Sequence, residues 1–177
     1  EFSNMPSVFL KEDVMPLSGF VGKKIYGIIG YHFFISFVVK VNYNAKTVKF
    51  ISPLKKTKIK GHKIPITLND NKPYTDLKVE QEGIGLTNIY TLIDCGASHS
   101  LSLESVANHK FPLPKKSIDG NLGVSLTNVI TGKIGRVERV HIGKFSFKNV
   151  ISTYPNYNID SLVNKDRNAN LGAEILS

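Results

Sequence analysis

The feature that most constrains the fold is a repeat whose two copies stand in different contexts. The first copy is Phe2–Pro6 followed by Gly27–Phe34, and the second is Phe147–Ile151 followed by Asn170–Leu176. In both copies a Phe-x-Asn-apolar segment precedes an apolar-Gly-x-polar-apolar-apolar element by a similar distance. Self-similarity of this kind indicates two related structural units in one chain.

The flanks of the two copies predict how the units divide. A β-hairpin pattern, with an Asn-rich turn at 44–46, follows the first copy, whereas the chain ends within five residues of Gly172. A long β-rich region precedes the second copy alone. We therefore expect residues 1–53 to be the C-terminal part of a first lobe and residues 54–61 to be a linker. Residues 62–177 would be a second lobe, truncated at its C-terminus.

Short β-branched and alternating segments predict a mostly β fold. Expected strands in the second unit are 65–68, 77–80, 89–93 and 98–102, with a turn at 69–73 between the first two. Leu103–His109 is expected to form a short helix. Pro112 and Pro114 then end regular structure, because proline lacks a backbone N–H.

The segment Tyr90–Ser98 carries the clearest chemical signal. Its apolar start, Tyr90–Ile93, predicts a buried strand that delivers Asp94 to a turn of small residues, where Gly96 lets the chain bend sharply. Where a strand leaves the hydrophobic core, desolvation or a neighbouring charge can shift the pKa of a carboxylate strongly. Asp94 is therefore the candidate catalytic residue, and a strand ending in an ordinary Asx turn is the competing interpretation.

The loop after this strand resembles the active-site loop of the retropepsin-like aspartic proteases, in which Asp is followed by Thr or Ser, Gly, Ala and Ser. The corresponding residues are Asp94, Cys95, Gly96, Ala97 and Ser98. Segment 26–43 is similar to the Gly-containing segment that packs behind such a loop in bacterial members, which usually have Asp where His32 stands. The resemblance implies acid-protease barrel lobes, the first incomplete, and hydrolysis of extended peptide or protein substrates without a cofactor. It also suggests a bacterial cell envelope or periplasm.

Gly120–His141 is expected to form a flap. Two strands, Val124–Ile130 and Lys133–Val140, would meet at a turn formed by Thr131 and Gly132. In the resembled family such a hairpin closes over the substrate and excludes water, while an ordinary surface hairpin is the alternative interpretation. The expected flap and substrate-binding residues are Val129, Ile130, Thr131, Gly132 and Lys133.

An aspartic protease holds two carboxylates so close that they share one proton, and this chain supplies one such loop. The remaining aspartates lie in polar or turn-like contexts: Asp13, Asp70, Asp76, Asp119, Asp160 and Asp166. The second catalytic carboxylate is therefore expected from a homodimer or from a missing upstream lobe. The chain alone would then be a weak or inactive peptidase.

Cys95 keeps a second function class open. A thiol is a weaker hydrogen-bonding group than the hydroxyl that the family has at this position. A noncatalytic retropepsin-like module that binds peptide or assembles with a partner is therefore the alternative. Cys95 as a nucleophile, with His99 or His109 as its base, is disfavoured, because a cysteine protease needs a positioned base and oxyanion donors and nothing local indicates them.

The rest of the composition argues against several partners. The longest apolar stretch, 25–41, is interrupted by Gly27, Gly30, His32, Ser36 and Lys40, so no membrane span is expected. The single cysteine and five scattered histidines predict no metal site. The net charge of +9 is spread along the chain, and the basic run at 55–60 has no interleaved aromatic residues, so no nucleic-acid binding is expected.

Overall fold

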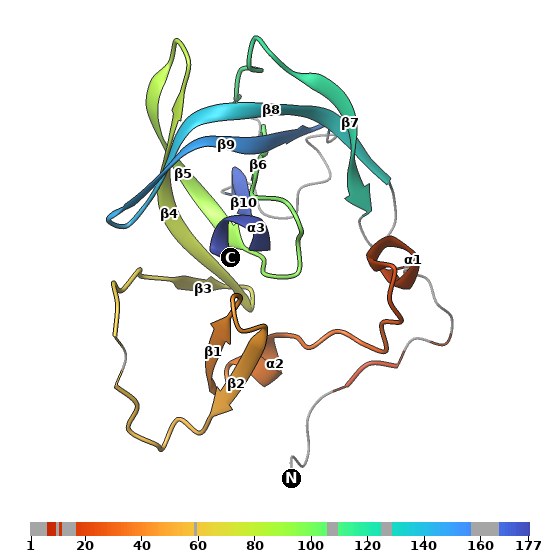
Figure 1. The fold of residues 1–177 in the computed structure, drawn as a ribbon, viewed down its shortest axis with the longest axis vertical. Coiled ribbons are helices and arrows are strands. Elements are labelled where there is room, and N and C mark those ends of the chain that lie inside the picture. The colour runs from red at the N-terminus through yellow and green to blue at the C-terminus, as the bar shows by residue number, and fades with distance from the viewer. Residues whose placement is uncertain are drawn as a thin grey trace. The chain divides into compact units, whose positions relative to one another are not determined.

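A computed structural model describes residues 7–9, 11, 17–58, 60–105, 110–124, 129–156 and 167–177. The chain forms two compact units, Glu1–Ile59 and Lys60–Ser177 (Figure 1). Strands dominate the second unit, and the first unit combines a β-hairpin with two short helices, so the described structure is mostly β as predicted. That the two units are related lobes joined by a linker stays a prediction.

The first unit contains the predicted hairpin. β1 (Val38–Asn42) pairs antiparallel with β2 (Thr47–Ile51), and the side chain of Asn42 accepts a hydrogen bond from the backbone N–H of Ala45 at 2.9 Å. Two short helices, α1 (Leu17–Val21) and α2 (Tyr31–Phe34), precede the hairpin. The Phe2–Pro6 part of the repeat lies outside the described residues.

The glycine-containing element of the first copy is exposed in its own unit. Ile28 and Ile29 are 66% and 55% exposed, and Gly30 has nothing within 4 Å of where a Cβ atom would lie. The expectation that this element packs inside a lobe is therefore not met for the first copy. The sequence of the first unit contains no Asp-x-Gly loop on which the element could pack.

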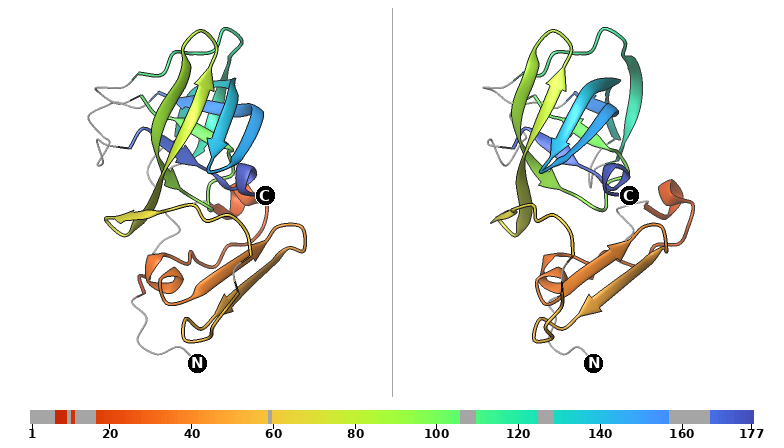
Figure 2. Two further views of the ribbon diagram at one scale, coloured as in Figure 1. Left: turned by 90° about the vertical axis from the view of Figure 1, so that its left-hand side faces the viewer. Right: turned by 60° about the vertical axis from the view of Figure 1, so that its left-hand side comes forward.

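The second unit is built on one eight-stranded mixed sheet with the order β3-β4-β5-β10-β6-β9-β8-β7. A further pairing between β4 and β8 closes part of this sheet into a ring. Figure 2 shows the sheet curving round on itself between the β4–β5 and β8–β9 hairpins. The strands are β3 (Thr67–Asn69), β4 (Lys72–Gln81), β5 (Gly85–Ile93), β6 (Leu101–Leu103), β7 (Ile118–Val124), β8 (Val129–Ile142), β9 (Phe145–Pro155) and β10 (Ala169–Leu171), followed by helix α3 (Ala173–Leu176).

The core of the second unit lies inside this curved sheet. Side chains from β4, β5, β6, β8, β9 and β10 fill it, and they are almost inaccessible to solvent. Examples are Val79, Leu101 and Val140, each fully buried, and Ile89 at 1% exposure. Burying an aliphatic side chain of this size contributes roughly 1.5–3 kcal/mol. The core therefore provides a rigid base for the loops between the strands.

Two sequence-based predictions are wrong. The first is the short helix predicted at Leu103–His109. Leu103 lies in β6, which is paired on both sides with β9 and β10, and Glu104 and Ser105 are not helical. Positions 106–109 lie outside the described residues. Thr131 and Gly132 are not a turn. Both lie within β8, and the connection to β7 falls at 125–128, outside the described residues.

Candidate active site

β5 delivers Asp94 to the surface of the second unit. The strand lies between β4 and β10, and Thr91 is fully buried within it. Regular pairing ends at Ile93, and the backbone N–H of Ala97 then donates to the carbonyl of Asp94 at 3.2 Å. The strand-then-turn prediction for this segment is confirmed.

The turn is stabilised by the carboxylate itself. Asp94 Oδ1 accepts a hydrogen bond from the backbone N–H of Gly96 at 3.0 Å, which is the local bond that Asp side chains make in turns. This bond fixes one carboxylate oxygen and leaves the other free of hydrogen bonds within the described residues. Asp94 is half-buried, while Cys95, Gly96 and Ser98 are exposed.

The segment that follows β10 holds the loop from behind. The backbone N–H of Asp94 donates to the carbonyl of Leu171 at 2.9 Å, and the N–H of Ala173 donates to the carbonyl of Ala97 at 2.8 Å. Between these two bonds, the N–H of Gly172 donates to the carbonyl of Ser100 at 3.1 Å. Two bonds therefore join the loop at 94–98 to the second copy of the repeat, and a third joins that copy to Ser100 just after the loop.

Gly172 has no room for a side chain. A Cβ atom there would collide with the carbonyl oxygen of His99 and lie 3.0 Å from the carbonyl oxygen of Ala97. Glycine is required because two backbones approach each other closely, not because of an unusual φ. The resemblance implied a glycine segment packed behind the loop, and the segment at 171–173 occupies that place.

His99 lies next to the loop and is mostly buried. Burial lowers the pKa of its imidazole, while hydrogen bonding to Asn170 and the nearby charges of Asp94 and Glu174 oppose this shift. Within the described part of the chain, no hydrogen-bond partner reaches Nε2 of His99. Lowering the pKa favours the neutral ring.

The hypothesis of a Cys95 nucleophile receives no geometric support. Cys95 is an exposed free thiol. Among the residues that the structure describes, no hydrogen bond links it to His99, and His109 lies outside them. An arrangement of nucleophile and base for cysteine chemistry is therefore not visible.

Two polar pairs on the elements that hold the loop were missed by the sequence reasoning. Ser100 donates from Oγ to Oε2 of Glu174 at 2.6 Å, which ties the return of the loop to α3. Glu104, only 1% exposed, accepts from Nε of Arg167 at 2.7 Å and from its terminal nitrogen at 2.6 Å. Burial raises the pKa of Glu104 and the Arg167 charge opposes that. A lone Glu after the apolar Leu101–Leu103 strand is the signal that could have indicated a buried ion pair.

The predicted flap residues lie at the start of β8. Val129 is 58% exposed, Thr131 is exposed, and Lys133 forms an ion pair with Asp119 of β7 at 2.8 Å. Within the described residues no hydrogen bond joins Val129, Ile130, Thr131, Gly132 or Lys133 to the loop at 94–98. The hairpin exists, but a role in binding substrate stays a prediction.

The described residues contain no second carboxylate in a comparable loop. Asp70, Asp76 and Asp119 are all exposed, and Asp70 sits in the β3–β4 turn with a φ of 50°. In the same part of the chain no group of three or more His, Cys, Asp or Glu side chains is arranged to hold a metal ion. Nor does any described helix have the length and apolar character needed to cross a membrane.

Comparison with known proteins gives one similarity. No protein-family model and no curated protein matches the chain. The chain is similar to a solved structure described as the crystal structure of a retropepsin-like aspartic protease from Rickettsia conorii, with 23% sequence identity and a TM-score of 0.41. The match covers 66% of this chain and 77% of that chain. This is the class of protein that the loop at 94–98 resembles.

Proposed function

We propose that the second unit is one half of an aspartic endopeptidase active site, with Asp94 as its catalytic carboxylate. The observation that carries the proposal is the way Asp94 is held. It follows a buried strand, one of its oxygens is fixed by Gly96, and its loop is bonded from behind to Leu171 and Ala173. A carboxylate that is held this firmly and still borders solvent is arranged for chemistry on an external substrate.

The chemistry requires a second carboxylate opposite the first. Two carboxylates that close share a proton, so one accepts a proton from the attacking water while the other donates a hydrogen bond to the scissile carbonyl. The free oxygen of Asp94 would face the shared water. The water attacks the peptide carbonyl, and the resulting intermediate breaks down as the leaving nitrogen takes up a proton.

The partner carboxylate would come from outside the second unit. A homodimer with a twofold axis through the loop would bring two copies of Asp94 together, because a twofold interface uses the same patch on both subunits. An upstream lobe with its own Asp-x-Gly loop is the other source. The exposure of Cys95 and Gly96 leaves room for either.

Cys95 supports the second candidate function, a noncatalytic module that binds peptide or assembles with a partner. Where the resembled family has a hydroxyl that bonds across two loops, this chain has an exposed thiol with no hydrogen bond among the described residues. A thiol is a poor substitute for a hydroxyl in such a bond. We therefore expect the chain by itself to cleave peptides weakly or not at all.

Digestion of a peptide library by the full chain tests both candidates. Cleavage would be measured at acidic and neutral pH, with and without an inhibitor of aspartic proteases, and the mass in solution would be measured alongside. Asp94→Asn keeps the shape of the side chain but cannot act as a base, so cleavage should fall to background. The matched control is Asp76→Asn on the exposed face of β4, which should leave cleavage unchanged.

The outcomes separate the candidates. Inhibitor-sensitive cleavage that disappears in Asp94→Asn and rises with dimer concentration supports the shared dyad. Peptide binding without cleavage, equal in the parent and Asp94→Asn, supports the noncatalytic module. Strong inhibitor-sensitive cleavage by a monomer would show that the half-site argument is wrong.

A further inference from the structure

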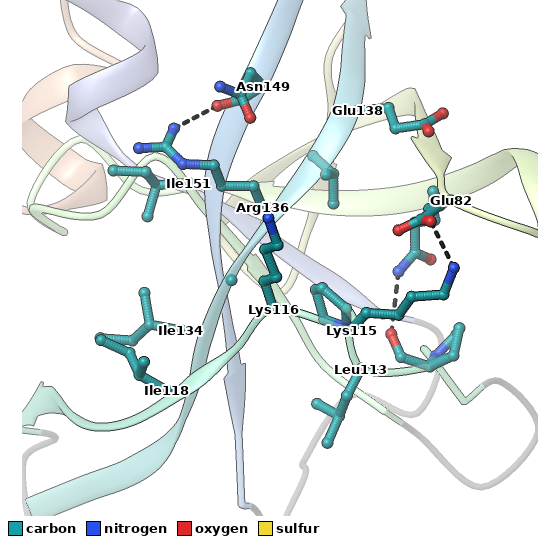
Figure 3. A pocket seen from close by; sticks show the side chains of 15 residues that line it. Glu82, Leu113, Lys115, Lys116, Ile118, Ile134, Arg136, Glu138, Asn149 and Ile151 are labelled. Atoms are coloured by element: carbon teal, nitrogen blue, oxygen red, sulfur yellow. Dashed lines mark hydrogen bonds and ion pairs between the residues drawn. The ribbon is translucent and has the colours of Figure 1, made fainter.

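A cavity of about 710 Å³ lies on the second unit, and no residue of the loop at 94–98 lines it. Its walls come from the end of β4, the segment 112–116, the start of β7 and the middle of β8 and β9 (Figure 3). Ligand sites typically measure roughly 300–1,000 Å³. The cavity is therefore large enough to hold a short peptide segment.

The cavity occupies a gap in the sheet. β8 pairs with β7 as far as Ile134, opposite Ile118, and with β4 only from Arg139, opposite Glu80. Between these points, residues 135–137 are paired with β9 on one side, and residues 135–138 have no paired strand on the other side. The ring of strands is thus open along four residues of β8.

The gap leaves backbone groups of β8 without partners. In an antiparallel sheet alternate residues direct both N–H and C=O to the same side, so half of the residues at 135–138 face the gap. Within the described part of the chain, no backbone hydrogen bond joins these residues to segment 112–117. Unpaired strand edges of this kind are the places where extended chains add to sheets.

The segment that borders the gap cannot fill it as a strand. Pro112 and Pro114 lack backbone N–H groups, so they cannot contribute to a ladder. A Cβ atom on Gly135 would lie 2.7 Å from Cγ of Pro114, which shows how closely the segment passes β8 without bonding to it. A Gln81 side chain instead donates to the carbonyl of Pro112 at 3.2 Å and closes one end.

Aliphatic side chains line one side of the cavity and remain exposed. Ile118 is 67% exposed and Ile151 is 38% exposed. In Figure 3 Ile118 lies beside Ile134, and Ile151 lies farther along the same side of the pocket, near Arg136. Leu113, 53% exposed, lies on the other side. Exposed apolar side chains that gather around a hollow favour an apolar ligand group.

Uncompensated positive charge borders the same aliphatic side. The Arg136 guanidinium donates from Nη1 to the backbone carbonyl of Asn149 at 2.6 Å, which leaves its charge unpaired with any described carboxylate. Lys116 forms no ion pair within the described residues, although its charge also acts on the Glu82 carboxylate. Lys115, by contrast, is neutralised by Glu82 at 2.7 Å. Glu138 lies on the rim too, but in Figure 3 its side chain and that of Arg136 extend in opposite directions.

We propose that this cavity is a second peptide site, which takes an extended segment by strand addition to β8. One face of this segment would carry both aliphatic and acidic residues, because Ile118, Ile151 and Arg136 lie on the same face of the sheet. The peptide backbone would pair with the gap-facing groups at 135–138. Its aliphatic side chains would rest on Ile118 and Ile151, and its carboxylates would meet Lys116 and Arg136. This site does not rest on the proposed peptidase activity, because Asp94 takes no part in it.

The test uses a fluorescein-labelled octapeptide, Val-Thr-Glu-Thr-Val-Thr-Glu-Thr, which carries valine and glutamate on the same face of an extended chain. It would be titrated into the full chain and followed by fluorescence anisotropy. The double variant Lys116→Glu/Arg136→Glu reverses the two unpaired charges and should weaken binding at least tenfold. Lys78→Glu, which reverses one charge on the exposed face of β4 outside the cavity, is the control for charge reversal and should change binding less than twofold. Both variants alter exposed side chains, and their melting curves would be measured in parallel.

Three further measurements fix the mode and the place of binding. A peptide with N-methylated backbone should bind at least tenfold more weakly, because it cannot donate to the β8 edge. The peptide should slow hydrogen exchange of the amides at 135–138. Asp94→Asn should bind it like the parent.

Several results would overturn the proposal: no binding by the parent, equal binding by the double variant and the Lys78→Glu control, or equal binding of the N-methylated peptide. Exchange protection at the loop 94–98 instead of at 135–138, or loss of binding in Asp94→Asn, would place the peptide at the candidate active site and overturn it as well.

Discussion

Gly172→Ala should strongly destabilise the second unit, because this position is where the loop of Asp94 is held from behind. The added Cβ atom would collide with the carbonyl oxygen of His99 and lie 2.9 Å from its carbonyl carbon. Both are backbone atoms, so no side chain can rotate away to make room. The segment after β10 must therefore separate from the loop.

The cost can be estimated from what this separation breaks. Overpacking of a well-packed site costs about 1–3 kcal/mol. The bonds from Gly172 to Ser100 and from Ala173 to Ala97 would lengthen, and each such bond contributes roughly 1 kcal/mol net. The sum is about 3–5 kcal/mol, which for a unit of this size lowers Tm by on the order of 10–20 °C.

The repeat supplies the control. Gly30 holds the equivalent position in the first copy, and a Cβ atom there would meet nothing within 4 Å. Its φ of −109° is open to any residue, so Gly30→Ala should change the free energy of unfolding by less than about 1 kcal/mol. Thermal and urea denaturation followed by far-ultraviolet circular dichroism would compare the two variants. If Gly172→Ala melts like Gly30→Ala, the close packing behind Asp94 is not present in solution.

Three further predictions address the surroundings of the site. Arg167→Met should lower the free energy of unfolding by about 3–5 kcal/mol at neutral pH, because it leaves the buried Glu104 carboxylate unpaired. In urea denaturation this loss should shrink at acidic pH as Glu104 becomes protonated, and a loss independent of pH would contradict the prediction. Folding lowers the pKa of His99 below the unfolded value of about 6.5. The contribution of neutral His99 to the free energy of unfolding is therefore present above that pH and is lost as pH falls through the folded-state pKa. His99→Gln should make the stability of the protein fall less steeply with decreasing pH, and an unchanged pH profile would refute this. Gly132→Ala should lower Tm, since its Cβ atom would collide with the carbonyl oxygen of Tyr154 on β9, and an unchanged Tm would favour the turn predicted from sequence.

Local turn chemistry was readable from the sequence. The Asn-rich segment at 44–46 does join β1 to β2, and Lys46 has a φ of 50°. In the β3–β4 hairpin, Asp70 and Asn71 both have positive φ, which is typical of a tight two-residue hairpin turn. These features depend on a few neighbouring residues, so sequence patterns capture them.

Long-range packing was the part that the sequence did not reveal. Gly132 was interpreted as a turn residue, yet it is needed where the backbone of β9 passes close to β8. The segment at 101–104 was expected to run from a strand into a helix. All four of its residues are buried between β9, β10 and the Arg167 side chain. In both places a partner distant in sequence decides the structure, and a glycine or an apolar run does not show which partner it has.

The same limit explains why the two copies of one motif behave differently. Leu171 is 2% exposed and Ile29 is 55% exposed, although each directly precedes the glycine of the repeated element. Leu171 is buried because β5 and β6 lie on either side of β10 and the loop at 94–98 covers its end. The first unit has no such loop in its sequence, so Ile29 has nothing equivalent to pack against. The motif therefore encodes the capacity to pack behind an Asp loop, and whether that capacity is used depends on the presence of the loop. Asp94 and the Leu171–Gly172 segment together, not either alone, constitute the candidate site.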